Sequence, residues 1–581
     1  MPIQQKMPGF IMSDAESVIG FFLNLFKRQY DDSNPGESDL QYKLLPLSSG
    51  SDQTYELRVK RGSKWHTRRM SISQVGEKVE SKSTCFKVIY DNQMVVKIPP
   101  KPIKNFKTYL THIKNERHIS HRLTPAIDCL SPSLSAILTK YPGLISNNEI
   151  TGDMREKEYI RLLAKKPQLQ DYLKIDGGFV FFMSLARHTF FNRVIEKTHE
   201  KKKRIQNEII NSSRAFDNIQ EFEALYGDHN NDIFFSINRI NTAFEKKIDE
   251  LLADDSNFPL PPVYKKKEWF FSGLAGKNPD IETDEFPDTF SAEINRLIKR
   301  LTTENKAEIS LYRKTIKTHV QKKMFDTNRS KIEGLVINIL NLLYNLKKQC
   351  IAVRDLKPDN IFVAGNADEA DHLLWDTQKY SLGLIDLETA VDFHPMDLKK
   401  IRQPSLAGTP TYMTPSHMFK NAILDQVFDE GAIRILYLQD WFAAMGMIYR
   451  VVRGKTLFNK TAKLIPQIMQ IKKKAIRQGK YLPDIMKNIS WGFWKSANTE
   501  FNNKIERNQS KFASLYLNLP RHLIVMLKDE IQIEKAEMEK LGQFNRMIKN
   551  QMTCDELLYV LFNIVYHAMY RQSWSNRKLP G

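Results

Sequence analysis

The residues with the clearest chemical potential form one short stretch, Val353-Arg-Asp-Leu-Lys-Pro-Asp-Asn360. An apolar helical pattern precedes it, and two apolar strand patterns come after it, the second of which ends at Asp386. The carboxylate of Asp355 can accept a hydroxyl proton, and the ammonium of Lys357 can offset charge on a transferred phosphoryl group. Asn360 and Asp386 carry oxygens of the kind that Mg²⁺ prefers. The spacing therefore predicts a phosphoryl-transfer site at strand ends and turns.

This stretch resembles the catalytic loop of the protein kinase superfamily, and of its eukaryotic-type Ser/Thr branch in particular. The family pattern, His-Arg-Asp-x-x-x-x-Asn, is matched at every position but the first. Earlier in the chain, Met94-Val-Val-Lys97 is similar to the family's Val-Ala-Ile-Lys, and Glu116 lies 19 residues later within a helical pattern. The resemblance implies that Lys97 grips the nucleotide phosphates and that Glu116 pairs with Lys97.

The stretch Gly408-Thr-Pro-Thr-Tyr-Met-Thr-Pro415 is similar to the end of a Ser/Thr kinase activation segment. This block favours a protein kinase over the related small-molecule phosphotransferases. The resemblance implies that Arg354 and Thr409 support this segment, where Arg354 could pair with a phosphate on Ser405 or Thr409. Ser416 stands where the family has a glutamate, so we expect an ion pair that closes the segment to be absent.

Two more blocks extend the resemblance, which spans residues from about 75 to 460. Asp440-Trp-Phe-Ala-Ala-Met-Gly446 looks like the family's central C-lobe helix, and Gly178–Ala186 resembles the strand and hinge that contact adenine. The resemblance implies that Asp440 accepts backbone hydrogen bonds from the catalytic loop and holds it rigid. It also implies ATP and Mg²⁺ as cofactors.

Several departures from the family pattern lie close to the predicted chemistry. Val353 replaces the histidine of the catalytic loop, which removes a hydrogen bond and predicts a less ordered loop. Between the strand patterns that flank the phosphate-covering loop there is one glycine, Gly76, where the family has three. Backbone approach to phosphate usually uses glycine, because no side chain intervenes. Gly76 is therefore the candidate phosphate contact, and the alternative is that this segment is an ordinary hairpin.

Asp386-Leu387-Glu388 replaces the family's Asp-Phe-Gly. The Cβ of Glu388 restricts the backbone freedom that glycine would give, so we expect the segment after Asp386 to have fewer conformations. The Glu388 carboxylate could also reach Mg²⁺ directly or through water. The alternative is that Glu388 points to solvent or pairs with a nearby lysine or arginine.

The rest of the chain predicts the elements that position these residues. Periodicity predicts a helix at the N-terminus, four strands before residue 100, a helix that carries Glu116, and charged helices from about 190 to 328 with a Pro-rich linker at 258–264. The predicted fold class is α+β: a two-lobed protein-kinase-like fold with a small β-rich N-lobe, a helical C-lobe, a large helical insert and a helical C-terminal extension. The expected parts are an N-terminal helix and linker at 1–50, the N-lobe and hinge at 51–189, the insert at 190–328, the C-lobe at 329–495 and the extension at 496–581.

Composition agrees with an ordinary globular protein. Of the 581 residues, 41% are hydrophobic and 27% are charged, which is not the balance of a disordered chain. The four cysteines are far apart, which argues against a disulfide scaffold and a zinc ribbon and fits a reducing compartment. No signal peptide pattern and no apolar run of roughly 18 residues is present, so the expected location is the cytoplasm.

The net charge of +20 and the pI near 9.4 favour anionic partners. Nucleic acid or an acidic membrane surface is possible on charge alone, but no motif supports either, and solvated lysine-rich faces are the favoured explanation of the excess. The charged helical composition of the insert, 190–328, suggests a surface for a protein partner.

We therefore predict an enzyme that moves the γ-phosphate of ATP to a Ser or Thr of an unidentified protein substrate. The main alternative is a pseudokinase scaffold that binds partners through the insert, which the glycine-poor loop and Glu388 favour. The intact set of Lys97, Asp355, Asn360 and Asp386 opposes that alternative. A second alternative is a small-molecule phosphotransferase.

Overall fold

The computed structural model shows an α+β protein, with an antiparallel sheet in its N-terminal part and mostly helices in the remainder of the chain. The chain forms two compact units: a sheet-containing unit, Met1–Ile195 with Lys331–Gly581, and a helical unit, Glu196–Ser330. The structure describes residues 14–30, 40–46, 52–61, 63–75, 83–145, 151–185, 188–253, 260–278, 290–365, 374, 376, 379–394, 403–404, 406, 408–428, 431–533, 543 and 545–571.

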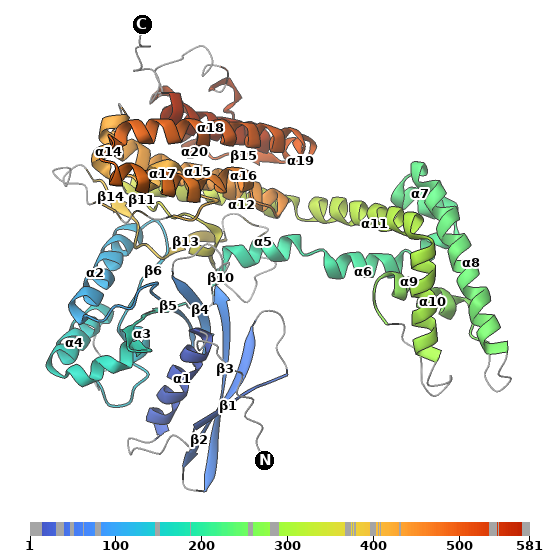
Figure 1. The fold of residues 1–581 in the computed structure, drawn as a ribbon, viewed down its shortest axis with the longest axis horizontal. Helices are drawn as coiled ribbons and strands as arrows, with labels where there is room; N and C mark the ends of the chain where they lie inside the picture. The colour runs from blue at the N-terminus through green and yellow to red at the C-terminus, as the bar shows by residue number, and fades with distance from the viewer. Residues whose placement is uncertain are drawn as a thin grey trace. The chain divides into compact units, whose positions relative to one another are not determined.

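A six-stranded antiparallel sheet carries the first of the chemically important residues. Its strands lie in the order β1-β2-β3-β4-β5-β9, so β5 has a neighbour on both sides. Figure 1 shows β1 to β5 of this sheet. Lys97 on β5 pairs with Cys85 of β4 and with Phe181 of β9. The four strands that the sequence predicts before residue 100 are confirmed. The strands of this sheet are β1 Leu40–Leu44, β2 Gln53–Arg61, β3 Lys64–Val75, β4 Thr84–Ile89, β5 Gln93–Ile98 and β9 Phe181–Ser184.

Two helices pack against this sheet, α1 at Asp14–Tyr30 and α2 at Phe106–Leu123, as the sequence predicts. The apolar face of α1, which includes Phe22 and Phe26, is buried on the sheet. Because α1 and β1 belong to this layer, the expected boundary at residue 50 does not separate a domain.

The C-terminal part of the sheet-containing unit surrounds one long buried helix, α15, Gly431–Arg453. A four-stranded sheet, in the order β10-β12-β13-β6, accompanies these helices. Its strand β13, Ser381–Ile385, ends directly before Asp386, and it pairs in parallel with β6, Cys129–Leu130. This pairing fixes the segment that carries Asp386 to the N-terminal part of the chain.

The remaining elements of this unit are mostly helices. The expected boundary at residue 495 falls inside α18, so it does not separate two domains. These elements are α3 Ser135–Leu138, α4 Gly152–Lys165, η2 Pro167–Leu173, β7 Lys174–Ile175, β8 Gly178–Phe179, β10 Thr189–Phe190, α12 Arg329–Lys348, β11 Ile351–Ala352, η5 Pro358–Asn360, β12 Ile361–Ala364, β14 Val391–Asp392, η8 Pro415–Met418, α14 Asn421–Val427, α16 Asn459–Ala462, α17 Leu464–Arg477, α18 Leu482–Glu506, α19 Gln509–Ala513, β15 Tyr516–Asn518, α20 Arg521–Ile533, β16 Gln551–Thr553 and α22 Cys554–Tyr566.

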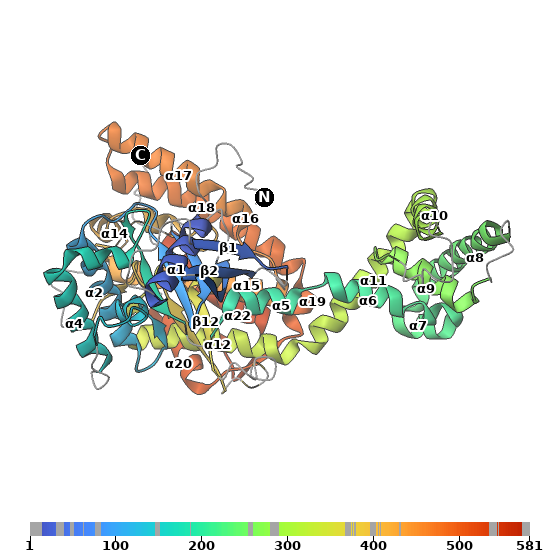
Figure 2. The ribbon, with the colours of Figure 1, turned by 90° about the horizontal axis from the view of Figure 1, so that it is seen from below.

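The helical unit is a bundle with its own apolar core, and α5, Phe191–His199, crosses its boundary with the rest of the chain. Helices α8, α9 and α10 contact one another in this bundle (Figure 2). The Pro-rich linker expected at 258–264 ends earlier, because α9 begins at Val263, directly after Pro262. The helices are α6 Lys202–Asn211, α7 Ile219–Tyr226, α8 Asn231–Ala253, α9 Val263–Leu274, α10 Phe290–Glu304 and α11 Lys306–Thr327.

Among the described residues of both units, no helix combines the length and the apolar composition needed to cross a bilayer.

Candidate active site

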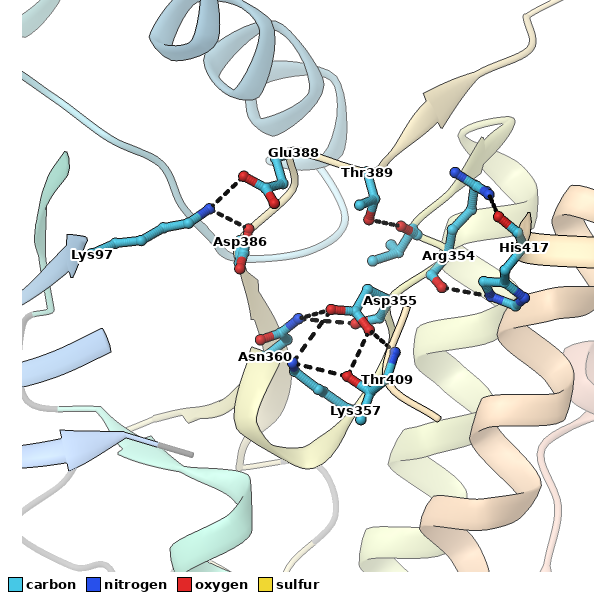
Figure 3. Close-up of polar contacts among 11 residues, drawn as sticks. Lys97, Arg354, Asp355, Lys357, Asn360, Asp386, Glu388, Thr389, Thr409 and His417 are labelled. Atoms are coloured by element: carbon cyan, nitrogen blue, oxygen red, sulfur yellow. Dashed lines mark hydrogen bonds and ion pairs between the residues drawn. The ribbon is translucent and has the colours of Figure 1, made fainter. Parts of the chain in front are cut away.

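Lys97 lies among three carboxylates that come from different elements. Its Nζ donates to Asp386 Oδ1 at 2.6 Å and to Glu388 Oε2 at 2.9 Å (Figure 3). Glu116, on the buried face of α2, is farther away, with 3.9 Å between its Oε1 and Nζ. The side chain of Lys97 is fully buried, so its charge is balanced by these acids rather than by water.

The predicted pair between Lys97 and Glu116 is therefore the longest of three contacts. Glu388 is a closer partner of Lys97 than Glu116 is, which confirms the expectation that Glu388 could pair with a nearby lysine. Glycine in that position would leave Lys97 with one fewer carboxylate. The departure from the family pattern thus changes the electrostatics around Lys97 directly.

Burial and charge act against each other in this cluster. Burial would lower the pKa of Lys97, but the carboxylates, led by Asp386, raise it well above its usual value. Burial would raise the pKa of Asp386, but the ammonium of Lys97 holds it below its usual value. For Glu116 burial prevails and raises its pKa to about 8, and neither of its oxygens has a hydrogen-bond partner among the described residues. Lys97 and Asp386 are a charged pair at neutral pH, and Glu116 is the uncompensated acid.

The same three acids have the chemistry to hold a divalent cation. Glu116, Asp386 and Glu388 each offer an oxygen, and these atoms lie within 4.8 Å of one another. Mg²⁺ favours such oxygen ligands. The ammonium of Lys97 binds two of these acids, Asp386 and Glu388, so a cation held by them would compete with Lys97 for their carboxylates.

The second cluster is formed by the predicted catalytic loop. Asp355 Oδ1 accepts hydrogen bonds from the backbone N and the Oγ1 of Thr409, both at 3.0 Å. Lys357 Nζ donates to Thr409 Oγ1 at 3.0 Å and lies 3.4 Å from Asp355 Oδ2. Asn360 Nδ2 donates to the backbone O of Asp355 at 2.9 Å and to its Oδ2 at 3.3 Å. The hydroxyl of Thr409 thus links the carboxylate and the ammonium through one donated and one accepted bond.

The two clusters influence each other. Burial would lower the pKa of Lys357, but the carboxylates of Asp355 and Asp386 outweigh it and raise the pKa. Lys357 is therefore charged and lies within the field of the acid that binds Lys97. The structure brings together all the predicted catalytic and metal-binding residues in the region shown in Figure 3: Asp355, Lys357, Asn360 and Asp386, with Lys97.

Asp440 on α15 holds the loop from behind, as the sequence predicts. Its two carboxylate oxygens accept hydrogen bonds from the backbone N of Val353 and of Arg354, both at 2.7 Å. Thr389 Oγ1 donates to the backbone O of Val353 at 2.8 Å, so a residue after Glu388 also fixes the loop. Burial raises the pKa of Asp440 to about 7, although these amides oppose the shift.

Two residues of the site have a left-handed backbone. The φ angles are 69° at Arg354 and 66° at Asp386, and neither residue is glycine. Such a conformation costs roughly 1–2 kcal/mol for a residue with a Cβ. The strain persists because neighbouring groups hold both residues: Asp440 binds the amide of Arg354, and Lys97 binds the carboxylate of Asp386.

Arg354 is placed differently from its expected role as a phosphate ligand. The residue is only 2% exposed. Its Nε donates to Gln439 Oε1 at 3.0 Å, and its Nη2 lies 3.5 Å from the backbone O of His417. A phosphate on Thr409 or elsewhere would have to compete with these buried acceptors. Ser405, the other candidate acceptor, lies outside the described residues.

Gly76, the candidate phosphate contact, also lies outside the described residues. Sequence reasoning missed Gln439 and His417, which contact Arg354 of the loop and belong to no motif. The one signal in the sequence is Val353, which stands where the family pattern has a histidine. An imidazole from another segment could therefore take the place of that histidine.

No family model matches the chain, and neither the curated proteins nor the solved structures contain a match to it.

Proposed function

We propose that the protein transfers the γ-phosphate of ATP to Ser or Thr residues of a protein substrate, on a two-lobed protein-kinase-like fold. The observation that carries this proposal is the triangle of Asp355, Lys357 and Thr409 beside the Lys97–Asp386 pair. An in-line transfer of phosphoryl to a hydroxyl uses two carboxylates and two ammonium groups of this kind.

Each side chain has a separate task in this proposal. Asp355 orients the acceptor hydroxyl and takes its proton, with Oδ2 as the receiving atom because both Thr409 bonds use Oδ1. Lys357 lies 3.4 Å from that oxygen, where its charge offsets the charge of the transferred group. The geometry of the loop is fixed by Asp440, so little reorganisation is needed during transfer.

Asp386 and Asn360 would hold Mg²⁺. Asn360 uses its Nδ2 to bind Asp355, which leaves its Oδ1 as the ligand atom. Bound Mg²⁺ would neutralise charge on the phosphates of the nucleotide. Lys97 would bind phosphate oxygens, and for this its contact with Glu388 must be exchanged for a contact with the nucleotide.

The proposal is tested by incubating the purified full chain with γ-labelled ATP and Mg²⁺ and mapping any labelled residue. We expect label on Ser or Thr, and we expect Asp355→Asn to reduce the rate by about 10²–10⁴ with nearly intact ATP binding by calorimetry. Asp228→Asn is the matched control, because the side chain of Asp228 is 90% exposed in the helical unit. Full turnover in Asp355→Asn would refute the role of Asp355.

One observation favours a second candidate, a pseudokinase scaffold. Lys97 already has two close carboxylate partners, Asp386 and Glu388, so the ammonium is satisfied without a nucleotide. If the wild-type chain shows neither ATP binding nor turnover, this candidate replaces the enzyme.

A further inference from the structure

The imidazole of His417 is buried beside the catalytic loop, on η8, and it makes two directional contacts. Its Nε2 lies 2.9 Å from the backbone O of Arg354, and its Nδ1 lies 3.1 Å from the backbone N of Thr414. His417 is 0% exposed, so no water competes for either bond. The two contacts join the end of the 408–415 segment to the loop that carries Asp355.

The partner of Nε2 determines where the ring carries its hydrogen. The carbonyl of Arg354 can only accept, so Nε2 must carry a hydrogen. On the other side of the ring, Nδ1 lies 3.1 Å from the backbone N of Thr414 and 3.2 Å from both the backbone O and the Oγ1 of Thr414. Burial and the nearby guanidinium of Arg354 lower the pKa of His417 to about 3, so the ring is neutral at pH 7 and its single hydrogen is the one on Nε2.

The contact acts on the residue whose backbone is strained. Arg354 has a φ of 69°, its amide is bound by Asp440, and its carbonyl is bound by His417. The carbonyl of Arg354 belongs to the same peptide plane as the amide of Asp355. Because both the amide and the carbonyl of Arg354 are hydrogen-bonded, the peptide plane between Arg354 and Asp355 cannot rotate. The position of the Asp355 Cα, and with it the origin of the Asp355 side chain, is therefore fixed.

A second set of bonds connects the same two segments. The guanidinium of Arg354 binds Gln439 Oε1, and Gln439 Nε2 donates to Ser416 Oγ at 2.8 Å. We expected an ion pair to be missing at Ser416, and hydrogen bonds through Gln439 connect Ser416 to Arg354 instead. The segment before His417 is thus anchored independently of His417, so loss of the imidazole does not by itself release η8.

We propose that His417 is a positioning residue for Asp355, and that its bond to the Arg354 carbonyl supplies the ordering that Val353 cannot give. This inference rests on the proposed phosphoryl transfer for its effect on rate. It assigns to a residue outside the catalytic loop the task of keeping the Asp355 carboxylate aligned with the acceptor hydroxyl.

Two substitutions separate the two bonds of the ring. In His417→Gln the side-chain amide reaches the position of Nε2 and can still donate to Arg354. In His417→Asn the shorter amide reaches only the position of Nδ1, so it keeps the contact with Thr414 and loses the one with Arg354. His229→Asn is the control, because the side chain of His229 is 78% exposed in the helical unit.

We expect His417→Asn to lower kcat by about 10–100-fold, the scale of a small misplacement of a catalytic group. The KM for ATP should change by less than about threefold, since in the proposed function Asp355 faces the acceptor hydroxyl rather than the nucleotide. His417→Gln should restore most of kcat. A folded His417→Asn with the kcat of the wild type, or a loss in His417→Gln as large as in His417→Asn, would overturn the inference.

Hydrogen exchange of the 353–360 segment tests the same contact without any turnover. We expect faster exchange in His417→Asn than in the wild type and His417→Gln, and equal exchange in all three would overturn the inference. If the wild type does not turn over at all, the proposed function fails, and this measurement still decides the role of His417.

Discussion

Two buried lysines show how differently the two units use charge. Lys97 in the sheet-containing unit faces Asp386, Glu388 and Glu116, and its side chain is fully buried. Lys266 in the helical unit is 5% exposed and pairs with one acid, Asp249, whose side chain is 41% exposed. The helical unit pairs its lysine with one acid that reaches water, whereas the sheet-containing unit surrounds its lysine with three acids, of which Glu116 is buried and the side chain of Glu388 is 38% exposed.

The net charge shows the same division. Residues 196–330 contain 23 Lys and Arg and 23 Asp and Glu, so the whole excess of +20 belongs to the sheet-containing unit. The core of the helical unit is apolar, with Phe244, Phe270 and Ile294 fully buried. We infer that the helical unit is built for stability, while the sheet-containing unit retains costly buried charges at its candidate site. The expectation of anionic partners then applies to the sheet-containing unit.

The largest expected effect comes from removing the two lysines in turn. Lys97→Met leaves three acids without their ammonium, which should cost about 3–5 kcal/mol of the free energy of unfolding. Lys266→Met leaves an acid that can be hydrated, and this should cost about 1 kcal/mol or less. Urea unfolding of both variants measures the difference. Equal losses would show that the two pairs are energetically alike.

The apolar core of the helical unit gives the next effect. Ile237 on α8 is fully buried, so Ile237→Ala should lower the free energy of unfolding of this unit by about 2–5 kcal/mol. ATP binding to the sheet-containing unit should stay unchanged in calorimetry. A parallel loss of ATP binding would mean that the two units do not fold separately.

The buried imidazole of His417 predicts a pH-dependent stability. Its folded pKa of about 3 lies below the ordinary value, about 6.5, so the contribution is complete above pH 6.5 and is lost as the pH falls toward 3. Between pH 7.5 and 5.5 the wild type should lose about 1.4 kcal/mol from this group. His417→Gln cannot titrate and should lack this loss in urea unfolding at the two pH values. The exposed His229, changed to Gln, should leave the loss in place.

A smaller effect is expected at Glu388. Its carboxylate binds Lys97 and, under the proposed function, would compete with nucleotide phosphate for the ammonium, so Glu388→Gln should tighten ATP binding by roughly three- to tenfold. The Mg²⁺ concentration for half-maximal activity should not change. A higher Mg²⁺ requirement in Glu388→Gln would instead assign Glu388 to the metal.

The smallest effect is expected when residues 196–330 are replaced by a flexible Gly/Ser linker. The unit has its own core and supplies no residue of the candidate site, so ATP binding should change by less than about twofold. Recruitment of a protein partner or substrate should change instead. Loss of the cooperative thermal transition would show that the insert completes the core of the sheet-containing unit.

Motif spacing allowed a large part of the site to be predicted. Lys97 on a strand, Asp355 and Asn360 in a loop, and Asp386 after a strand meet because strands and turns of ordinary geometry bring them there. The family resemblance also implied that Asp440 supports the loop, and its carboxylate binds two consecutive amides in the structure.

Partners that depend on tertiary packing could not be predicted. His417 reaches Arg354 across 63 positions of the chain, and no periodicity connects them. The choice of Lys97 between Glu116 and Glu388 depends on a difference of about an ångström, which the sequence does not encode locally. The burial of Arg354 could not be predicted either, because arginine side chains are mostly exposed and are fully buried only when they are paired.

The parallel pairing of β6 with β13 has a consequence for the order in which the chain folds during its synthesis on the ribosome. Leu130 cannot pair with Ile385 until Ile385 has been synthesised. At 5–20 residues per second, the 255 residues that follow Leu130, up to and including Ile385, take roughly 13–50 s to synthesise. All six strands of the N-terminal sheet lie before residue 185 and the helical unit is continuous in the chain, so both can fold during this interval, whereas β6 still lacks its partner β13. Nascent chains should therefore acquire protease resistance first at the N-terminal sheet and in the helical unit, and around Leu130 only after Ile385 has been synthesised.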